Sequence, residues 1–584
     1  MTRGISRPYR SRLVRPCDAC RRRRIACIRA QEDKDCSLCR HRGKTCTFDD
    51  APQMRRRPRA REAPVTSTVV AGSETHPVSP EALLGSGTTM FPNRTCLYTG
   101  ASGDQDPDVL RHLVYDDIGR FGHDSWTVWR VSIADGLPSY FTIYPNSHLD
   151  GHPGMYSLEK VESVFVPYED ELTRLYYTHF HPSYPILESQ EGFQARRARR
   201  EVPGSLLAMI YYHGAQFWRL SPLAGTDTPP VQEILPWIFS CLTMEARTPN
   251  LSLVQALLLY MQMIPSQIRA PNHPGFWPLT STLVGIAQDV GLHVDPANWN
   301  IAPSERKMRR IMWWAVLMHD KWMSHLLGRP SHIIHRSWNV EVLTLTDFSD
   351  DQDRVSVEEI SSSQAFISLC SLTMVLSEVS DSFYTIRSKF EIIPVEEQRS
   401  QAEALLLQVQ YWMDHIPLLT TNSPTHSYTT RLLALTVALS IKRAVFSKLT
   451  AQHNTHESSG IATSIIDIVR HALFPVLESL EGANSTGMWL SYSRGGLTMT
   501  GSLLMTLLLS SVGDEDFQER RALLIEYRSF LKRLNELHAQ TGHFEVARLP
   551  LRRLNLIMEQ LFGTGDSETP GSTAISDDMG VDVI

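Results

Sequence analysis

The chain has 584 residues, of which 42% are hydrophobic and 21% are charged, and its formal net charge is −6. This composition suits a soluble protein with one large or two medium-sized folded domains and some irregular stretches. It argues against a membrane protein, because the most apolar uncharged span, residues 495–513, contains six Ser and Thr and only nine strongly apolar residues, and therefore predicts a buried amphipathic helix.

The charges are distributed unevenly along the chain. Residues 1–62 hold 19 Lys and Arg against 7 Asp and Glu, a net charge of +12, so the remaining residues carry −18. A basic terminal block on an acidic body is typical of a small module that binds nucleic acid, although solvated basic tails are also common. Residues 1–16 alternate Arg with small and polar residues and lack an apolar stretch, so we expect no signal peptide.

Six of the nine cysteines lie in the basic block, where the spacing C-x2-C-x6-C occurs twice. They are Cys17, Cys20, Cys27, Cys36, Cys39 and Cys46. Without a secretory signal, such closely spaced cysteines indicate metal thiolates rather than disulfides. Each C-x2-C step lets two thiolates grip one ion at the start of a short helix, and the third cysteine returns about two turns later.

This cysteine set predicts two zinc ions. Two tetrahedral ions need eight ligand positions, whereas the block offers six thiolates, so two cysteines would have to bridge. Zinc would then be the folding nucleus of a segment that is too short to form its own core. The alternatives are a purely stabilising zinc knuckle that does not contact DNA, disulfides, or an iron–sulfur cluster.

The sequence CDACRRRRIAC at 17–27 closely resembles the fungal zinc binuclear cluster transcription factors. The resemblance implies that Cys17 and Cys36 bridge the two zinc ions. It also implies that the basic residues after the second cysteine end a short helix in the DNA major groove and read CGG-type triplets. By position, Arg24 becomes the principal base-reading residue, Arg23 its neighbour, and Arg21 a phosphate contact.

Two features depart from this family pattern. Ala26 stands where the family usually has another basic residue, and the loop 28–35 is acidic and lacks a proline that is common there. Neither change affects a predicted zinc ligand. We therefore expect them to alter DNA affinity and half-site preference more than the fold.

A second basic run follows the cluster and comprises Arg55, Arg56, Arg57, Arg59 and Arg61. Clustered arginines suit nuclear import receptors, and they also suit an arm that contacts phosphates. Pro52, Pro58 and Pro64 interrupt the stretch in which many family members form a coiled coil, so we expect any homodimer to form through the helical body. Residues 63–96 are rich in Ser, Thr, Pro and Gly and predict a disordered, flexible linker.

The body, residues 97–562, is predicted to be all-α because helical periodicity dominates from Tyr168 onward. One apolar helical face includes Leu172, Leu175, Tyr176 and Phe180. A helix is expected from Pro278 to Val290, with Gly291 as a left-handed stop. Another begins with Ser304 as its cap and ends at Gly328. Further helices are expected near 205–218, 251–264, 362–378, 400–414, 429–449, 463–480, 497–512 and 517–538.

Four motifs in the middle of the body resemble the fungal-specific transcription factor regulatory domain. They are AQDVGLH at 287–293, RRIMWW at 309–314, DKW at 320–322 and GRPSH at 328–332. Of these motifs, DKW and GRPSH, together with LYTG at 97–100 and the nearby Asp106-Pro107, are similar to the TamA-type nitrogen-utilisation coactivators. We expect Trp313, Trp314 and Trp322 to lie in the core. We also expect Asp320, Lys321 and Arg329 to form an internal ion-pair network.

Residues 563–584 lack Lys and Arg and predict an acidic disordered tail, either a frayed terminus or an activation segment. The chain shows none of the common catalytic motifs, so we expect no enzyme. These features predict a nuclear, sequence-specific DNA-binding factor that regulates RNA polymerase II transcription of metabolic genes, with double-stranded DNA and the transcription machinery or co-regulators as partners. The alternative is a coactivator that acts mainly through protein contacts.

Overall fold

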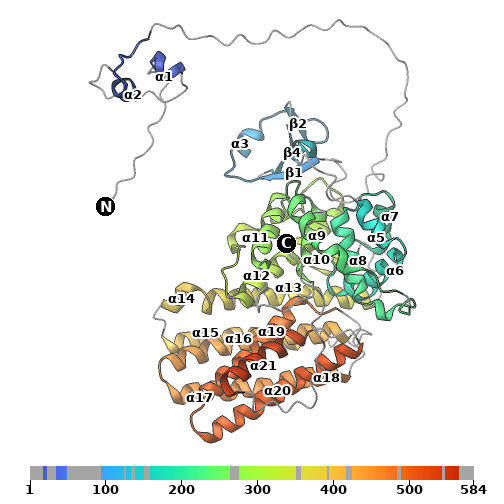
Figure 1. Cartoon of the computed structure of the whole chain (residues 1–584), viewed down its shortest axis with the longest axis vertical. Helices are drawn as coiled ribbons and strands as arrows, with labels where there is room; N and C mark the ends of the chain where they lie inside the picture. Colours follow the sequence, from blue (N-terminus) through green and yellow to red (C-terminus); the bar gives the residue numbers. More distant parts are fainter. Residues whose placement is uncertain are drawn as a thin grey trace. The chain divides into compact units, whose positions relative to one another are not determined.

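The fold is described from a computed structural model of the chain (Figure 1). It describes residues 17–22, 35–48, 94–123, 126–132, 138–149, 158–225, 227–263, 275–349, 357–390, 394–415, 424–482, 488–541 and 546–563. The chain divides into two compact units, Met1–Val78 and Ser79–Ile584. The acidic tail beyond residue 563, and the predicted linker up to residue 93, lie outside the described residues.

The described part of the second unit begins with a four-stranded antiparallel sheet in the order β1-β4-β3-β2. Its elements are β1 (Arg94–Thr99), α3 (Pro107–Leu110), β2 (Arg120–His123), β3 (Trp126–Arg130), β4 (Tyr140–Pro145) and α4 (Asn146–Leu149). This sheet is not among the elements that the sequence predicts, and β1 begins before residue 97, where the body was expected to start. Trp129 pairs with Phe141 across β3 and β4, and Cys96 pairs with Ile143 across β1 and β4.

Both faces of the sheet are covered. On one face, Trp129, Phe141 and Ile143 pack against Trp299, which precedes the long helix of the body. The guanidinium of Arg309 lies 5.2 Å from the centre of the Trp299 ring, and the backbone N–H of Asn300 donates to Val131 O at 2.8 Å. On the other face, Leu110 of α3 packs on Val128 and Tyr140. The sheet is therefore anchored to the helical body through its first face.

The other regular elements in the described part of this unit are helices, so the prediction of a mainly helical body is confirmed, with the small sheet as an addition. The first part of the body comprises α5 (Leu158–Phe165), α6 (Glu169–Leu175), a π-helical turn (Tyr176–Phe180), α7 (Gln190–Ala198), α8 (Gly204–Ala215), α9 (Val231–Glu245), α10 (Leu251–Met261), α11 (Phe276–Asp289) and α12 (Pro303–Leu327). Short 3-10 turns cover His181–Ser183, Trp218–Leu220, His335–Ser337 and Leu345–Asp347.

The second part comprises α13 (Val357–Phe383), α14 (Ile386–Phe390), α15 (Val395–His415), α16 (Pro424–Ala451), α17 (Thr455–Ile468), a π-helical turn (Val469–Leu473), α18 (Phe474–Gly482), α19 (Ser491–Leu509), α20 (Asp514–Thr541) and α21 (Arg548–Phe562). In Figure 1 these helices, coloured yellow to red, form a layer beside the green helices of the first part. The unit has two large apolar cores: the first joins the first part to α13 and α15, the second lies among the later helices, and α16 contributes to both.

Helix α12 is the centre of the first core, and every residue from Ile311 to Trp322 is buried, since apolar side chains occupy all faces of the helix as far as Met318. Its predicted stop is confirmed, since Gly328 has φ +64°. Its predicted cap is wrong: the N-cap is Ala302, and Pro303 occupies the first helical position, where a missing N–H costs nothing. The predicted core position of Trp313, Trp314 and Trp322 is confirmed.

Polar side chains connect α12 to a helix far away in the sequence. The Tyr492 hydroxyl, fully buried at the start of α19, accepts a hydrogen bond from Gln262 Nε2 at 3.2 Å and lies 3.2 Å from His319 Nδ1. His319 Nε2 in turn lies 3.3 Å from the Thr280 hydroxyl. The Tyr492 ring also stacks on Trp322, with ring centres 5.8 Å apart. Tyr492 therefore closes the first core although it belongs to the C-terminal part of the chain.

The predicted ion-pair network at the end of α12 is partly wrong. The buried Asp320 carboxylate accepts hydrogen bonds from His332 Nδ1 at 2.9 Å and from the backbone N–H of Ile333 at 3.1 Å. Lys321 Nζ donates to Ser331 Oγ at 2.9 Å and not to Asp320. Arg329 is exposed and lies over the Trp277 ring at 5.7 Å. The network therefore fixes the turn after α12 and excludes Arg329.

Two helical stretches of the described chain, Glu359–Phe383 and Thr455–Glu481, are long and apolar enough to cross a membrane. In each, about half of the most apolar window is buried inside the protein, 50% and 44% respectively. Leu372 of the first stretch belongs to the first apolar core, and Leu477 of the second stretch belongs to the second apolar core. The span at 495–513, for which a buried helix was predicted, contains most of α19, which packs against α16, α20 and α21.

Candidate metal centre

Two short helices position the cysteines of the first unit. Cys17 directly precedes α1 (Asp18–Arg22) and Cys20 lies within it, while Cys36 directly precedes α2 (Ser37–His41) and Cys39 lies within it. Each C-x2-C step therefore starts a helix, as the spacing predicts. These four side chains are at most 2% exposed and form the small core of the described part of this unit.

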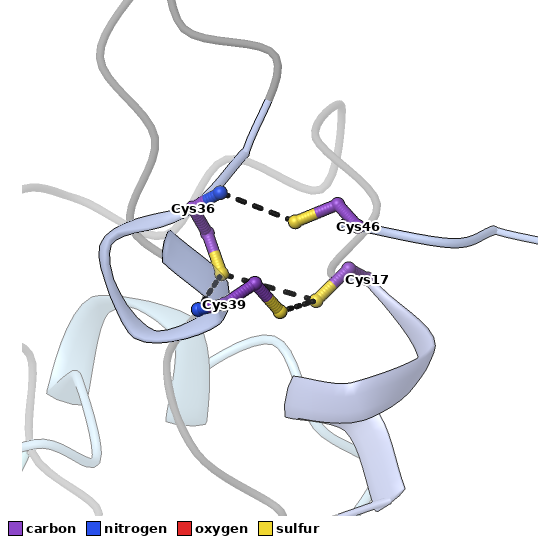
Figure 2. Close-up of side chains that lie close together, drawn as sticks. All are labelled: Cys17, Cys36, Cys39 and Cys46. Carbon is purple, nitrogen blue, oxygen red and sulfur yellow. Dashed lines mark hydrogen bonds between the residues drawn. The ribbon is translucent and has the colours of Figure 1, made fainter. Parts of the chain in front are cut away.

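Four thiols converge on one point (Figure 2). The Sγ atoms of Cys17, Cys36, Cys39 and Cys46 all lie within 4.8 Å of one another. Cys17 Sγ is 4.0 Å from Cys36 Sγ and 3.8 Å from Cys39 Sγ. Cys20 also joins the group, because its Sγ lies 3.6 Å from Cys36 Sγ. Cys36 is thus close to thiols from both helices.

These distances fit a zinc thiolate site. Four sulfurs about 2.3 Å from a tetrahedral zinc ion are about 3.8 Å from one another. A disulfide would require a separation of about 2.05 Å, and all of these cysteines are free thiols. Cys17, Cys36, Cys39 and Cys46 could therefore hold one metal ion, for which a borderline-soft ion such as Zn²⁺ is the chemical match.

Hydrogen bonds bring the two ends of the module together. The backbone N–H of Cys46 donates to Asp35 Oδ1 at 2.6 Å, and the backbone N–H of Cys36 donates to Cys46 Sγ at 3.1 Å. The backbone N–H of Asp18 donates to Thr47 O at 2.8 Å. Asp35 is not among the predicted site residues, although its position directly before the fourth cysteine was a usable signal. The hydrogen bond from Cys46 to the Asp35 carboxylate places Cys46 beside the other thiols.

The thiols differ in acidity because their surroundings differ. The backbone N–H of Cys39 donates to Cys36 Sγ at 3.4 Å, and this hydrogen bond lowers the pKa of Cys36 to about 6. Burial raises the pKa of Cys39 to about 12. The thiols lie close together, and the pKa is lowered for Cys36 and raised for Cys39. A divalent cation suits such a site because it stabilises every thiolate at once.

The side chains of the remaining predicted site residues lie outside the described part of the chain. Arg21 belongs to α1, but its side chain lies outside the described residues, as do Cys27, Arg23 and Arg24. The basic run, Arg55, Arg56, Arg57, Arg59 and Arg61, also lies outside them. Their roles stay predictions.

Comparison with known proteins identifies the helical body. Residues 173–414 match the fungal specific transcription factor domain. The matched region runs from α6 to α15 and includes α12. Over these residues the chain is similar to the fungal transcriptional regulators that carry this domain, as its resemblance to them predicted.

Several relatives are fungal regulators. The chain is 25% identical to an uncharacterized transcriptional regulatory protein of Schizosaccharomyces pombe, over 66% of this chain and 66% of the relative. It is 25% identical to the transcriptional activator protein DAL81 of Saccharomyces cerevisiae, over 70% of this chain and 46% of the relative. It is 28% identical to the acetamidase regulatory protein of Aspergillus oryzae, over 40% of this chain and 28% of the relative. The matches thus span less than two thirds of the length of these relatives. No solved structure matches the chain significantly.

Proposed function

We propose that this protein is a nuclear, sequence-specific DNA-binding factor that regulates RNA polymerase II transcription of metabolic genes. The observation that carries the proposal is the convergence of Cys17, Cys36, Cys39 and Cys46 on one point within a block of net charge +12. A metal-thiolate module of this kind has no catalytic site of its own, and its surrounding arginines suit a polyanion. We therefore propose no enzymatic role.

We further propose that the module holds two zinc ions. Cys36 Sγ lies within 4.0 Å of Cys17 Sγ and within 3.6 Å of Cys20 Sγ, which supports a bridging role for Cys36 between two ions. Cys17, Cys36, Cys39 and Cys46 would hold one ion, with Cys17 and Cys36 shared. Cys20 and Cys27 would complete the other.

In this proposal α1 enters the major groove of a CGG-type half-site. Arg24, just beyond α1, would read a guanine through its bidentate guanidinium, with Arg23 beside it, and Arg21 would contact a phosphate. Arg55, Arg56, Arg57, Arg59 and Arg61 would serve nuclear import. Because Pro52, Pro58 and Pro64 interrupt a coiled coil, a homodimer would form through the helical body.

The names of the relatives support a metabolic role, since several are acetamidase regulatory proteins. Nitrogen-utilisation genes or a secondary-metabolite gene cluster are the targets that we propose. A second candidate function, a coactivator that acts mainly through protein contacts, is favoured by Ala26, where a basic residue that would contact phosphate is missing. Transcription machinery or co-regulators would be partners in both cases.

The test compares DNA binding by the full chain and its variants on a duplex with one CGG triplet and on a mutated duplex. Arg24→Ala should cost about 1–3 kcal/mol on the CGG duplex and reduce discrimination against the mutated one. Arg21→Ala should weaken binding to both duplexes equally and flatten the salt dependence. Arg42→Ala, an exposed change after α2, is the matched control.

Equal binding of the CGG duplex by wild type and Arg24→Ala would refute the base-reading assignment. Promoter occupancy that survives Arg24→Ala in cells would favour the coactivator.

A further inference from the structure

Helix α19 begins among buried residues and packs along α16 in the same direction. Gly496 lies against α16 so closely that a Cβ there would overlap Thr436 Oγ1. One turn further along both helices, Ser440 Oγ lies 3.3 Å from Met499 Sδ. Because the contacts advance together, the two helices are parallel. Thr429, about two turns before Thr436 on the same face of α16, therefore lies at the level where α19 starts.

Four polar side chains at this level each have a buried atom without a hydrogen-bond partner among the described residues. The atoms are Thr429 Oγ1, Trp489 Nε1, Ser491 Oγ and Ser493 Oγ. Thr429 is 4% exposed and Ser493 is 0% exposed, so bulk water does not reach either hydroxyl. Buried polar groups are nearly always hydrogen-bonded in native proteins. We call these residues the α19 polar cluster, and its unmet hydrogen bonds indicate a bound group.

The start of α19 favours an anion as that group. The helix has 19 residues, and its N-cap, Leu490, offers no side-chain hydrogen bond. The N-terminal N–H groups of a helix and its dipole make this end partly positive, and only the N–H of Ser491 receives a side-chain acceptor there, from Gln262 Oε1 at 2.9 Å. Side chains of a helix tilt toward its N-terminus, so the Ser493 hydroxyl in the first turn is directed toward the same end.

A buried guanidinium adds a full positive charge to this end of the helix. Arg494, the fourth residue of α19, is 8% exposed, and its Nη2 donates to Met263 O at 3.2 Å. The groups around the start of α19 are therefore hydroxyls, an indole N–H, backbone N–H groups and a guanidinium, all of which can donate hydrogen bonds. Such a set of donors matches the oxygens of a carboxylate or a phosphate group.

We propose that the start of α19 binds the carboxylate or phosphate group of a small molecule. Ser491, Ser493 and Trp489 donate to its oxygens from α19, and Thr429 donates from α16. Tyr492, which completes the first core, lies between the two serines, so the bound anion also stabilises the packing of α19 on that core. The helical body thereby gains a ligand-sensing role, which goes beyond the proposed DNA binding and does not depend on it.

The experiment measures thermal unfolding of the zinc-loaded full-length chain by circular dichroism at 222 nm. Phosphate, acetate and chloride, each at about 50 mM, are compared at equal ionic strength and pH. A ligand that binds only the folded state raises the midpoint, and wild type should unfold at least about 1 °C higher in phosphate or in acetate than in chloride. Anions bound by the basic N-terminal block do not affect this transition of the body.

Variants separate the site from general salt effects, which act alike on every variant. Ser493→Ala should abolish the gain in midpoint, and Thr429→Val should reduce it. Ser502→Ala is the matched control on the same helix, because its hydroxyl already donates to Thr498 O, and it should respond as wild type does. A response to phosphate alone would identify a phosphate-bearing ligand, and a response to acetate alone a carboxylate.

The chloride samples provide a second readout. Without a ligand the Ser493 hydroxyl gives up no hydrogen bond, so Ser493→Ala should unfold at the wild-type temperature or above it. A midpoint several degrees lower would show that this hydroxyl has a partner within the protein, and would overturn the site. Wild type that gains nothing in either anion, or that gains no more than Ser493→Ala, would overturn it as well.

Discussion

At the scale of single residues, Glu245 is a carboxylic acid with few partners in the interior. It lies at the end of α9, is 5% exposed, and its Oε2 accepts a hydrogen bond from Ser205 Oγ at 2.6 Å. Its Oε1 has no hydrogen-bond partner among the described residues. Burial raises the pKa of Glu245 to about 7, because the charged form loses its hydration there. Near neutral pH the folded chain therefore holds a proton that the unfolded chain has released.

This sets a direction for stability against pH. Since the pKa of Glu245 is higher in the folded chain, the folded state is penalised as pH rises from about 4.5 to about 7. We expect Glu245→Gln, which cannot ionise, to stabilise the protein by on the order of 2 kcal/mol more at pH 8 than at pH 5. Urea unfolding of wild type and variant at both pH values measures this difference. Glu526→Gln, an exposed change on α20, should show no such pH dependence.

At the scale of elements, two glycines end neighbouring helices but differ in how closely other residues pack against them. Gly291 follows α11 with φ +74°, and Gly328 follows α12 with φ +64°, so both occupy the left-handed region that the sequence predicted for Gly291. A Cβ on Gly291 would lie 2.8 Å from Phe141 Cζ, whereas a Cβ on Gly328 would meet nothing within 4 Å. Gly291 is thus a helix stop and also one of the points where β4 contacts the helical body.

The two glycines therefore predict unequal costs. Gly328→Ala should cost about 1 kcal/mol for the left-handed backbone alone. Gly291→Ala adds overlap with Phe141 and should cost about 2–4 kcal/mol in total. Thermal unfolding of both variants measures the order, and quenching of Trp129 and Trp299 fluorescence should increase only in Gly291→Ala. Equal destabilisation of the two variants would show that Phe141 of the sheet does not exclude a side chain at position 291.

The helices could be predicted because their signals are local. The periodicity of apolar residues indicated α8, α10 to α13, α15, α16, α19 and α20, with ends that differ from the observed ones by up to about six residues. α9 was missed because Pro236 stands inside it and Pro230 caps it, which normally argues against a helix. The sheet was missed because β4 is buried on both sides at Tyr140 to Ile143, so its side chains show no apolar and polar alternation, and its partner β1 lies some forty residues upstream.

The candidate metal site could be predicted further than the sheet, since thiol spacing is itself a geometric signal. The spacing does not say which thiols share an ion. The Sγ distances among Cys17, Cys36 and Cys39 arise because the cysteines at α1 and α2 pack together, and the Asp35 hydrogen bond joins Cys46 to the residue before Cys36. That packing depends on contacts between residues about twenty positions apart, which the spacing alone does not reveal.

At the scale of the whole molecule, the two units depend on different forces. The described part of the first unit has two five-residue helices and a core of four cysteines, too few apolar groups to fold without metal. The second unit has extensive apolar cores. Metal removal should therefore act on one unit only.

A chelator titration tests this separation. Excess chelator should abolish binding to the CGG duplex, while circular dichroism at 222 nm and the cooperative thermal transition of the body should remain within a few per cent of their starting values. Added zinc should restore DNA binding. A body that unfolds with the chelator would contradict the independence of the two units.

The buried hydroxyl of Tyr492 bears on how the protein is made on the ribosome. The matched regulatory domain ends at residue 414, yet its core is completed by a side chain that is synthesised almost eighty residues later. Until then, Gln262 and His319 lack their buried partner and the ring of Trp322 lacks its stacking surface. We therefore expect the first core to be completed only after α19 leaves the exit tunnel, so that the apolar faces of α10 and α12 would be exposed to chaperones for longer than in a chain whose core is contiguous.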